Sequence, residues 1–414
     1  MSSSINELNL SLNSMPWHAK VVLNLLNRLE YGQLEIETPS NEILFFYGKQ
    51  DGHHAHIKIH DWAVCERALK SGDIGFCEAY IDQLWDSKDL LALLRLLLQN
   101  RRTIERVIYG SWWGRLTYQI KHWLNRNSKS GSKKNIHAHY DIGNAFYSLW
   151  LDPTMTYSSA LFKKEDESLI QAQINKYQRI IDELGISKEH RLLEIGCGWG
   201  GMMEVATQQG IAIDCLTISQ EQAKFAKERA QRIHQTERAQ ILIRDYRDHT
   251  DQYDGIASIE MFEAVGEQYW DTYFKTVYQC LKPGKKACIQ TIVIAEDLFE
   301  RYRHNTDFIQ QYVFPGGMLP SRASFRASAA KAGLKVEGEF AFGSDYAKTL
   351  CLWRDSFNQK LQEVRQLGFD EAFIRLWNFY LMYCAAGFSE RNIDVVQFTL
   401  SHHSTRTSSD ALSA

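Results

Sequence analysis

The stretch Arg191-Leu-Leu-Glu-Ile-Gly-Cys-Gly-Trp-Gly-Gly201 decides the fold of this chain. Its first half is apolar and predicts a buried strand, and its second half predicts a glycine-rich turn that leads into a helix. Because glycine has no Cβ, the backbone N–H groups of such a turn can approach a ligand closely. A tight strand-to-helix turn without a ligand would use similar residues, so the turn by itself is only a moderate indication of a binding site.

The spacing of the glycines narrows the choice of ligand. The turn has the form E-x-G-x-G-x-G, which differs from the G-x-G-x-x-G of dinucleotide sites, and it lacks the G-K-[ST] ending of a phosphate loop. What remains is the S-adenosylmethionine (SAM) turn of a methyltransferase, in which the glycines lie close to the amino-acid end of the ligand. We therefore expect Glu194, Gly196, Gly198 and Gly200 to belong to a SAM site.

The residues around this turn alternate between candidate strands and candidate helices. Five runs are expected to be strands, namely 192–195, 212–216, 240–243, 255–259 and 286–294. This alternation predicts an α/β fold, a Rossmann-like and mostly parallel sheet with helices on both faces. The string Lys282-Pro-Gly-Lys285 predicts a turn that leads into the fifth strand.

Ligands of an open α/β sheet bind at the carboxyl ends of its strands. The second strand ends near Thr217 and Ile218, where many SAM sites place an acid, so we expect hydroxyl and amide contacts from Thr217 and Gln222 instead. At the end of the third strand, Asp245 could accept a hydrogen bond from the adenine amine and Tyr246 could cover the ring. A helix cap and a packed aromatic ring are an equally good interpretation of these two residues.

The composition is that of an ordinary globular chain. It has 414 residues, 44 % of them hydrophobic and 23 % charged, and a net charge of −3, which does not indicate a nucleic-acid partner. The eight cysteines lack metal-binding spacing, so we interpret them as reduced, buried thiols of a cytoplasmic protein and predict no metal site. Neither a signal peptide nor a membrane-spanning run is expected.

Four parts are expected along the chain. Residues 1–127 are predicted to form a smaller α+β N-terminal domain that associates with lipid or membrane, followed by a small, polar linker at 128–135. Residues 136–400 are predicted to form the catalytic domain, and the Ser- and Thr-rich tail 401–414 is predicted to be disordered. Strand or helix periodicity occurs in four runs of the first part, which are 32–38, 53–60, 61–69 and 90–102.

Longer strings from residue 137 onward narrow the chemistry further. They are His139-Tyr-Asp-Ile-Gly-Asn144, Leu151-Asp-Pro-Thr-Met-Thr-Tyr-Ser-Ser-Ala-Leu-Phe162, Ile259-Glu-Met-Phe-Glu-Ala-Val-Gly266, Phe314-Pro-Gly-Gly-Met-Leu-Pro-Ser321 and Asp345-Tyr-Ala-Lys-Thr-Leu350. With the glycine turn, these strings resemble the cyclopropane-fatty-acyl-phospholipid synthases and their relatives, the mycolic acid cyclopropane synthases. The resemblance implies methyl transfer from SAM to a cis double bond of a phospholipid acyl chain, followed by loss of a proton that closes a cyclopropane ring.

The resemblance also implies roles for individual residues. Tyr157 and Ser158 match SAM contacts, and Tyr140 matches an aromatic residue beside the reacting carbons, where its ring face would stabilise a carbocation. The proton acceptor of this family is a bound bicarbonate ion. The residues that match its contacts are Ser159, Glu263, Gln290, Ile292 through its backbone, and Tyr346.

Two of these positions depart from the usual pattern of the family. This chain has Ser159 where many members have cysteine, and Gln290 where many have histidine. A hydroxyl and an amide can hydrogen-bond an anion, but glutamine cannot take up a proton as histidine does. By resemblance to the family we still expect a ring. A methylene or methyl branch is the alternative, because these two departures concern the group that removes the proton. An amine methyltransferase of the same fold and a non-catalytic lipid- or SAM-binding protein are further alternatives.

A phospholipid has to be partly lifted from the bilayer before its double bond can reach a buried site. Apolar residues beside a Pro-Gly-Gly string predict a mobile lid at 301–317. Tryptophans interleaved with basic residues across 112–126 fit an interfacial helix on anionic lipid, and equally a helix packed between two domains. We expect peripheral contact with the inner face of the cell membrane, and by resemblance a homodimer.

Overall fold

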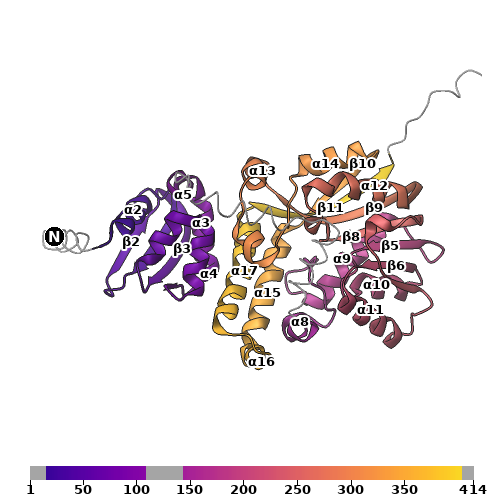
Figure 1. The fold of residues 1–414 in the computed structure, drawn as a ribbon, viewed down its shortest axis with the longest axis horizontal. Helices are drawn as coiled ribbons and strands as arrows, with labels where there is room; N and C mark the ends of the chain where they lie inside the picture. The colour runs from indigo at the N-terminus through magenta and orange to yellow at the C-terminus, as the bar shows by residue number, and fades with distance from the viewer. Residues whose placement is uncertain (1–14, 109–142, 403–414) are drawn as a thin grey trace, which may run out of the picture. The chain divides into compact units, whose positions relative to one another are not determined.

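The computed structural model describes residues 15–108 and 143–402, and these residues form two compact units (Figure 1). The described parts of the first unit are 15–108, 300–315 and 346–393, and those of the second are 143–299, 316–345 and 394–402. The chain passes from one unit to the other at Pro315–Gly316, within the expected lid segment. The expected linker and the expected helix at 112–126 lie outside the described residues, and the expected domain boundaries stay predictions.

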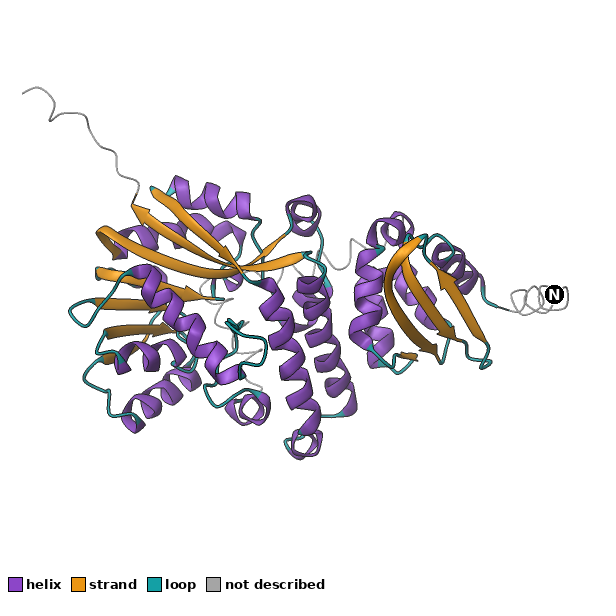
Figure 2. Cartoon of the chain, turned by 180° about the vertical axis from the view of Figure 1, so that it is seen from behind, coloured by secondary structure: helices purple, strands orange, loops and turns teal. Residues whose placement is uncertain are grey.

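The second unit is built on a twisted sheet, whose strands are orange in Figure 2. The sheet has seven strands in the order β10-β11-β9-β8-β5-β6-β7. Its strands are β5 (Arg191–Ile195), β6 (Ala212–Thr217), β7 (Ala239–Ile243), β8 (Tyr253–Ile259), β9 (Leu281–Ile294), β10 (Leu334–Ala341) and β11 (Ile393–His402). The ladders that join β7, β6, β5, β8 and β9 are parallel, whereas β10 and β11 pair antiparallel. All five expected strands are present, which confirms the expected α/β fold.

One strand begins earlier than expected. β9 starts at Leu281, before the Lys282–Lys285 turn, and its register on β8 moves from Tyr253↔Leu281 to Gly255↔Lys286. The four turn residues therefore bulge out of the ladder, and Gly284 adopts the left-handed backbone with a φ of 75°. The turn chemistry was correctly predicted, but it interrupts the strand instead of preceding it.

Helices cover both faces of this sheet. On one face, α9 (Leu169–Leu184), α10 (Gly201–Gln208) and α11 (Gln220–Arg232) pack with one another, and on the other α12 (Trp270–Cys280) packs against α14 (Arg322–Lys331). A serine caps the first turn of α9, α11 and α14, because its hydroxyl accepts a hydrogen bond from an N–H that the helix cannot satisfy. These caps are Ser168, Ser219 and Ser321.

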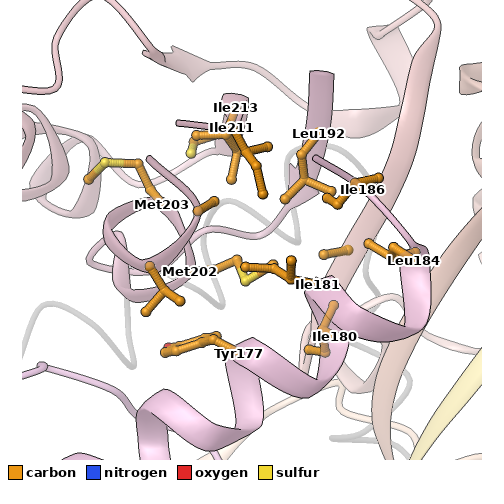
Figure 3. Packing of buried hydrophobic residues seen from close by; sticks show 14 of the residues in the cluster. Tyr177, Ile180, Ile181, Leu184, Ile186, Leu192, Met202, Met203, Ile211 and Ile213 are labelled. Carbon is orange, nitrogen blue, oxygen red and sulfur yellow. The ribbon is translucent and has the colours of Figure 1, made fainter. Parts of the chain in front are cut away.

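The core beneath the glycine turn is formed by α9, α10 and the adjoining strands (Figure 3). Tyr177 and Ile180 of α9 point toward Met202 and Met203 at the start of α10. Gly201 permits the close approach of the two helices, because a Cβ at that position would collide with the Tyr177 hydroxyl. The packing therefore fixes where the turn between β5 and α10 lies.

The first unit combines the N-terminal residues with two segments that are distant in sequence. Its sheet has the order β2-β1-β3-β4, with β1 (Tyr31–Glu37), β2 (Ile43–Tyr47), β3 (Gln50–Ile59) and β4 (Trp85–Asp86). The helices are α2 (Trp17–Leu26), α3 (Ala63–Ile81), α4 (Leu90–Gln99), α5 (Arg101–Ile108), α15 (Gly343–Gln359), α16 (Leu361–Gln366) and α17 (Glu371–Ser389). None of the described helices has the length and apolar character needed to cross a membrane.

Polar contacts fasten α17 and the residues after it to the N-terminal part. Glu390 accepts a hydrogen bond from Nε of Arg95 at 2.7 Å and pairs with Nε2 of His53 at 2.9 Å. Arg375 donates to the backbone carbonyl of Trp85 at 2.9 Å. α17 also packs against α3 and α4, so the first unit is completed by residues that follow most of the second unit in sequence.

All eight cysteines are free, as expected. Six are buried, and Cys351 and Cys384 are partly buried. Burial raises the pKa of Cys65 and Cys288 to about 12, so these thiols stay protonated and behave as small apolar side chains.

Candidate active site

The glycine turn joins β5 to α10 and uses a backbone that favours glycine. The φ angles of Gly196, Gly198 and Gly200 are 85°, 50° and 82°. A Cβ on Gly196 would lie 2.6 Å from Cγ of Met261, whereas a Cβ on Gly198 would have no other atom within 4 Å. The turn is thus tightly packed on one side and open at Gly198, an arrangement that fits a ligand lying against the backbone.

Glu194 lies at the end of β5 beside this turn and is 3 % exposed. Burial raises its pKa to about 8, opposed by a weak hydrogen bond from Sγ of Cys215 and by the charges of Lys176 and Arg229. Glu194 therefore holds a proton at neutral pH and can donate a hydrogen bond as well as accept one.

The residues at the end of β6 that are expected to contact SAM are hydrogen-bonded to one another. The hydroxyl of Thr217 donates to Oε1 of Gln222 at 3.0 Å and accepts from the N–H of Ser219 at 3.1 Å. Ile218, between them in sequence, is partly buried. The hydroxyl and amide are therefore oriented before any ligand binds, and their contacts with SAM stay predictions.

Asp245 and Tyr246, which follow β7 after Arg244, form the helix cap and the packed aromatic ring that the sequence left open as an interpretation. Asp245 caps the short helix Tyr246–Asp248 through the N–H of Arg247 and forms a two-pronged ion pair with the same guanidinium, at 2.6 and 2.9 Å. Tyr246 packs edge-on against Tyr273, with ring centroids 5.5 Å apart. Contacts of Asp245 and Tyr246 with adenine stay predictions.

Two carboxylates follow β8 and gather most of the expected catalytic residues. Oε1 of Glu260 accepts hydrogen bonds from the N–H of Ser159 and from Nε2 of Gln290, both at 2.8 Å. Oε1 of Glu263 accepts from the N–H of Ile292 at 2.5 Å, and its buried Oε2 has no hydrogen-bond partner among the described residues. The structure thus brings together Ser159, Glu263, Gln290 and Ile292, and it adds Glu260.

The amide of Gln290 is fixed by a hydrogen-bond chain that leads away from the carboxylates. Gln290 is fully buried, and its Oε1 accepts from Nε2 of Gln397 at 3.0 Å. Oε1 of Gln397 accepts in turn from Arg179 at 2.5 Å. Because Gln397 and Arg179 occupy the acceptor side, the Gln290 amide presents its N–H group to Glu260.

Lys176 is a buried charge that the sequence analysis missed. It lies on α9 with no exposed surface and donates to the hydroxyl of Ser158 at 2.6 Å and to Oε1 of Gln173 at 2.7 Å. Burial lowers its pKa to about 7, opposed by the negative charges of Glu260, Asp152 and Glu194. Lys176 therefore links the Ser158–Ser159 segment to the acidic groups on β5 and after β8.

The sequence contained a signal for each missed residue. Glu260 directly follows an expected strand, at the carboxyl end where ligands bind, within one of the strings that carried the family resemblance. Lys176 lies four residues from both Ala172 and Ile180, which places it on the apolar stripe of its helix. A lysine on such a stripe can be buried only where its ammonium group has polar partners. Here Lys176 has two, Ser158 and Gln173.

Three of the expected site residues lie elsewhere or have other contacts. Tyr140 lies outside the described residues, and Tyr346 lies on α15 in the first unit, where its ring packs against Phe388 at 4.5 Å. The ring of Tyr157 packs against Tyr147 at 5.3 Å. The expected roles of Tyr140, Tyr346 and Tyr157 stay predictions.

Glu194 and Glu263 should make the protein less stable as the pH rises. Burial raises both pKa values from their usual 4.5 to about 8, so between these values the folded protein holds protons that the unfolded chain has released. Proton linkage then lowers the free energy of unfolding by up to about 1.4 kcal/mol per pH unit for each group. Thermal unfolding of Glu194→Gln and Glu263→Gln should show a shallower decline over this window, and an unchanged decline in the double variant would contradict the assignment.

A mostly parallel seven-stranded sheet, with an open glycine turn after its first parallel strand, is typical of the class of SAM-dependent methyltransferases. The sequence model of the mycolic acid cyclopropane synthetase family matches residues 127–398. The chain belongs to this family. It is accordingly a SAM-dependent methyltransferase, as expected, and SAM is its cofactor.

Known proteins resemble the chain over most of its length. It is 36 % identical to the tuberculostearic acid methyltransferase UfaA1 of Mycobacterium tuberculosis over 348 residues, 82 % of this chain and 81 % of that protein. It is 34 % identical to the cyclopropane-fatty-acyl-phospholipid synthase of Escherichia coli (strain K12) over 350 residues, 84 % of this chain and 88 % of that protein. The crystal structure of mycolic acid cyclopropane synthase CmaA1 complexed with SAH and CTAB has a TM-score of 0.61 and 31 % identity, covering 65 % of this chain and 97 % of that one.

Proposed function

We propose that this protein transfers the methyl group of SAM to a cis double bond in a phospholipid acyl chain and closes a cyclopropane ring. The observation that carries the proposal is the proximity of the glycine turn to the carboxylate centre. Gly196 of the turn lies against Met261, which is next to Glu260 and two residues before Glu263 in sequence. A methyl donor held at the turn would therefore lie near the carboxylate of Glu260, whose negative charge would stabilise positive charge.

The residues of this centre suit a reaction that passes through a carbocation. SAM, when bound, supplies a methyl group on a positively charged sulfur. Glu260 would provide negative charge for the cation. The rings of Tyr147, Trp150 and Tyr157 pack on one another, and Tyr157 directly precedes Ser158 and Ser159 in sequence, so these rings would provide ring faces and exclude water. Exclusion of water matters because water would quench the cation.

The expected bicarbonate ion does not fit the donors as they are arranged. The N–H of Ser159 and Nε2 of Gln290 donate to Glu260, and the N–H of Ile292 donates to Glu263. A further anion would lose these donors and would lie beside the carboxylate of Glu260, whose negative charge would repel it. The proposed reaction therefore includes no step through bicarbonate.

A methylene or methyl branch is the second candidate product. It is favoured by the similarity to a protein named for tuberculostearic acid and by Gln290, whose amide cannot accept a proton. Methyl transfer to the double bond is common to both candidates, so the choice of product depends on which group removes which proton.

Release of SAH from SAM tests the proposed acceptor. The purified protein would be incubated with vesicles of a cis-monounsaturated phospholipid, with vesicles of its saturated counterpart, or with a soluble amine. We expect SAH only with the unsaturated vesicles. Release with the amine alone would favour the amine methyltransferase, and no release with any unsaturated lipid would favour a non-catalytic binding protein.

We further propose that the first unit contacts the inner face of the cell membrane, from the cytoplasm, through its edge strand β2. Ile43, Phe45 and Tyr47 alternate along this strand and are 55, 50 and 65 % exposed, whereas Phe46 between them is buried. An exposed row of apolar and aromatic side chains is typical of an interaction surface, and aromatic rings suit the membrane interface.

Replacing Phe45 and Tyr47 together by serine should reduce co-sedimentation with anionic vesicles several-fold and leave the melting temperature nearly unchanged. The change removes exposed apolar surface and the stacking of these two rings, and it leaves the buried Phe46 in place. Ile170→Ser, at an exposed residue of the second unit, is the matched control. Unchanged vesicle binding with a shift from dimer to monomer in gel filtration would instead assign this row to contact between two copies of the chain.

A further inference from the structure

Glu260 has a backbone conformation that its side chain disfavours. Its φ is 49°, in the left-handed region, where a residue other than glycine or asparagine is strained. Its N–H is held by a hydrogen bond of 2.8 Å to the carbonyl of Gln290. Glycine would adopt this conformation without strain, so the glutamate is retained at a cost in stability, and such strain is concentrated at functional sites.

The side chain of Glu260 is placed where an anion was expected. Its Oε1 receives the N–H of Ser159 and the Nε2–H of Gln290, from two of the positions that the family resemblance assigns to bicarbonate. A carboxylate and a bicarbonate ion present the same planar O–C–O group to hydrogen-bond donors. The protein therefore supplies from its own chain the acceptor that the ion would bring.

We propose that the carboxylate of Glu260 is the base that accepts the proton released on ring closure. This inference deepens the proposed function and rests on it. The electron pair of the double bond forms a bond to the methyl carbon as the bond from that carbon to sulfur breaks, which leaves SAH and a positive charge on the adjacent chain carbon. The electrons of one C–H bond of the new methyl group then form the second C–C bond, and the proton moves to Glu260. The acid returns its proton to water after product leaves.

The titratable groups around Glu260 support its role as the base. Burial and the charge of Glu260 together raise the pKa of Glu263 to about 8, so Glu263 keeps its proton at neutral pH. Lys176 lies close enough for its charge to act on Glu260, and Asp152 and Glu194 are the other acidic groups that act on Lys176. The proton on Glu263 removes the repulsion that a second negative charge beside Glu260 would cause.

Two substitutions at one position test the proposal. Glu260→Gln keeps the size of the side chain and an acceptor oxygen but removes the base, so turnover on unsaturated vesicles should fall at least about 100-fold and added bicarbonate should not restore it. Glu260→Gly relieves the backbone strain but leaves both donors and Lys176 without their buried acceptor, so its melting temperature is measured beside its turnover to confirm that it folds. Its turnover should be low in buffer freed of carbon dioxide and should rise several-fold with added bicarbonate.

The natural protein is the decisive comparison in the same assay. Its turnover should be unchanged when carbon dioxide and bicarbonate are removed. A loss of turnover that bicarbonate restores, or a Glu260→Gln variant within a few-fold of natural activity, would overturn the proposal. Absence of SAH release by the natural protein on all unsaturated vesicles would count against the proposed function. SAH release that depends on bicarbonate would count only against the role of Glu260 as the base.

Discussion

Gly196→Ala is expected to lower the affinity for SAM about 10- to 100-fold. The new Cβ would lie 2.6 Å from Cγ of Met261, so either the turn or the segment that leads to Glu263 has to move. Overpacking of this kind costs about 1–3 kcal/mol, and 1.4 kcal/mol corresponds to tenfold in a dissociation constant. Isothermal titration with SAM measures the change directly.

Gly284→Ala is the matched control for this substitution. Gly284 also has a left-handed backbone, with a φ of 75°, but a Cβ there would have no other atom within 4 Å. The control therefore introduces the same backbone strain, about 1–2 kcal/mol, without a steric clash near the site. We expect its affinity for SAM to be unchanged. Equal losses in the two variants would show that backbone strain, and not contact with Met261, explains the effect.

Lys176→Met is expected to destabilise the protein by about 3 kcal/mol or more and to lower its affinity for SAM. The change leaves the hydroxyl of Ser158 and the amide of Gln173 without their buried donor, and leaves Glu260 without the nearby positive charge. Removal of one partner from a buried charged cluster typically costs about 3–5 kcal/mol. Denaturant unfolding measures the stability, and the titration with SAM measures whether the Ser158 segment has moved.

Lys188→Met controls for the loss of a lysine as such. The side chain of Lys188 is 75 % exposed, and its ion pair with Glu189 is long, at 3.9 Å. An exposed pair of this kind contributes little to stability, so the control should change it by less than about 1 kcal/mol. Similar values for Lys176→Met and Lys188→Met would contradict the assignment of Lys176 to a buried cluster.

The parallel sheet could be predicted because its evidence is local. Each strand is a short apolar run bounded by turn residues, and the glycine turn needs left-handed backbone at three positions that only glycine adopts readily. The start of β9 was misplaced because Pro283 and Gly284 indicate a turn, and local pattern cannot show that pairing resumes on the same strand. The residue types that form a turn can thus be recognised in the local sequence, whereas the pairing of strands on either side of the turn cannot.

Periodicity could not predict which segments of the chain make up the first unit. The amphipathic pattern of α17 shows that one face is buried but does not identify α3 and α4 as its partners. The carboxylate centre was predicted only in part for a similar reason. Ser159 and Gln290 were named as separate departures from a family pattern, and their common hydrogen bond to Glu260 depends on tertiary structure.

The mass of the product shows whether this protein closes a cyclopropane ring. The natural protein would be incubated with SAM and vesicles of a cis-monounsaturated phospholipid, and the released acyl chains would be weighed by mass spectrometry before and after mild hydrogenation. We expect a chain that is one CH₂ heavier and takes up no hydrogen, which is a cyclopropane. A heavier chain that takes up hydrogen would mean a methylene product, and acyl chains of unchanged mass would contradict methyl transfer to the double bond.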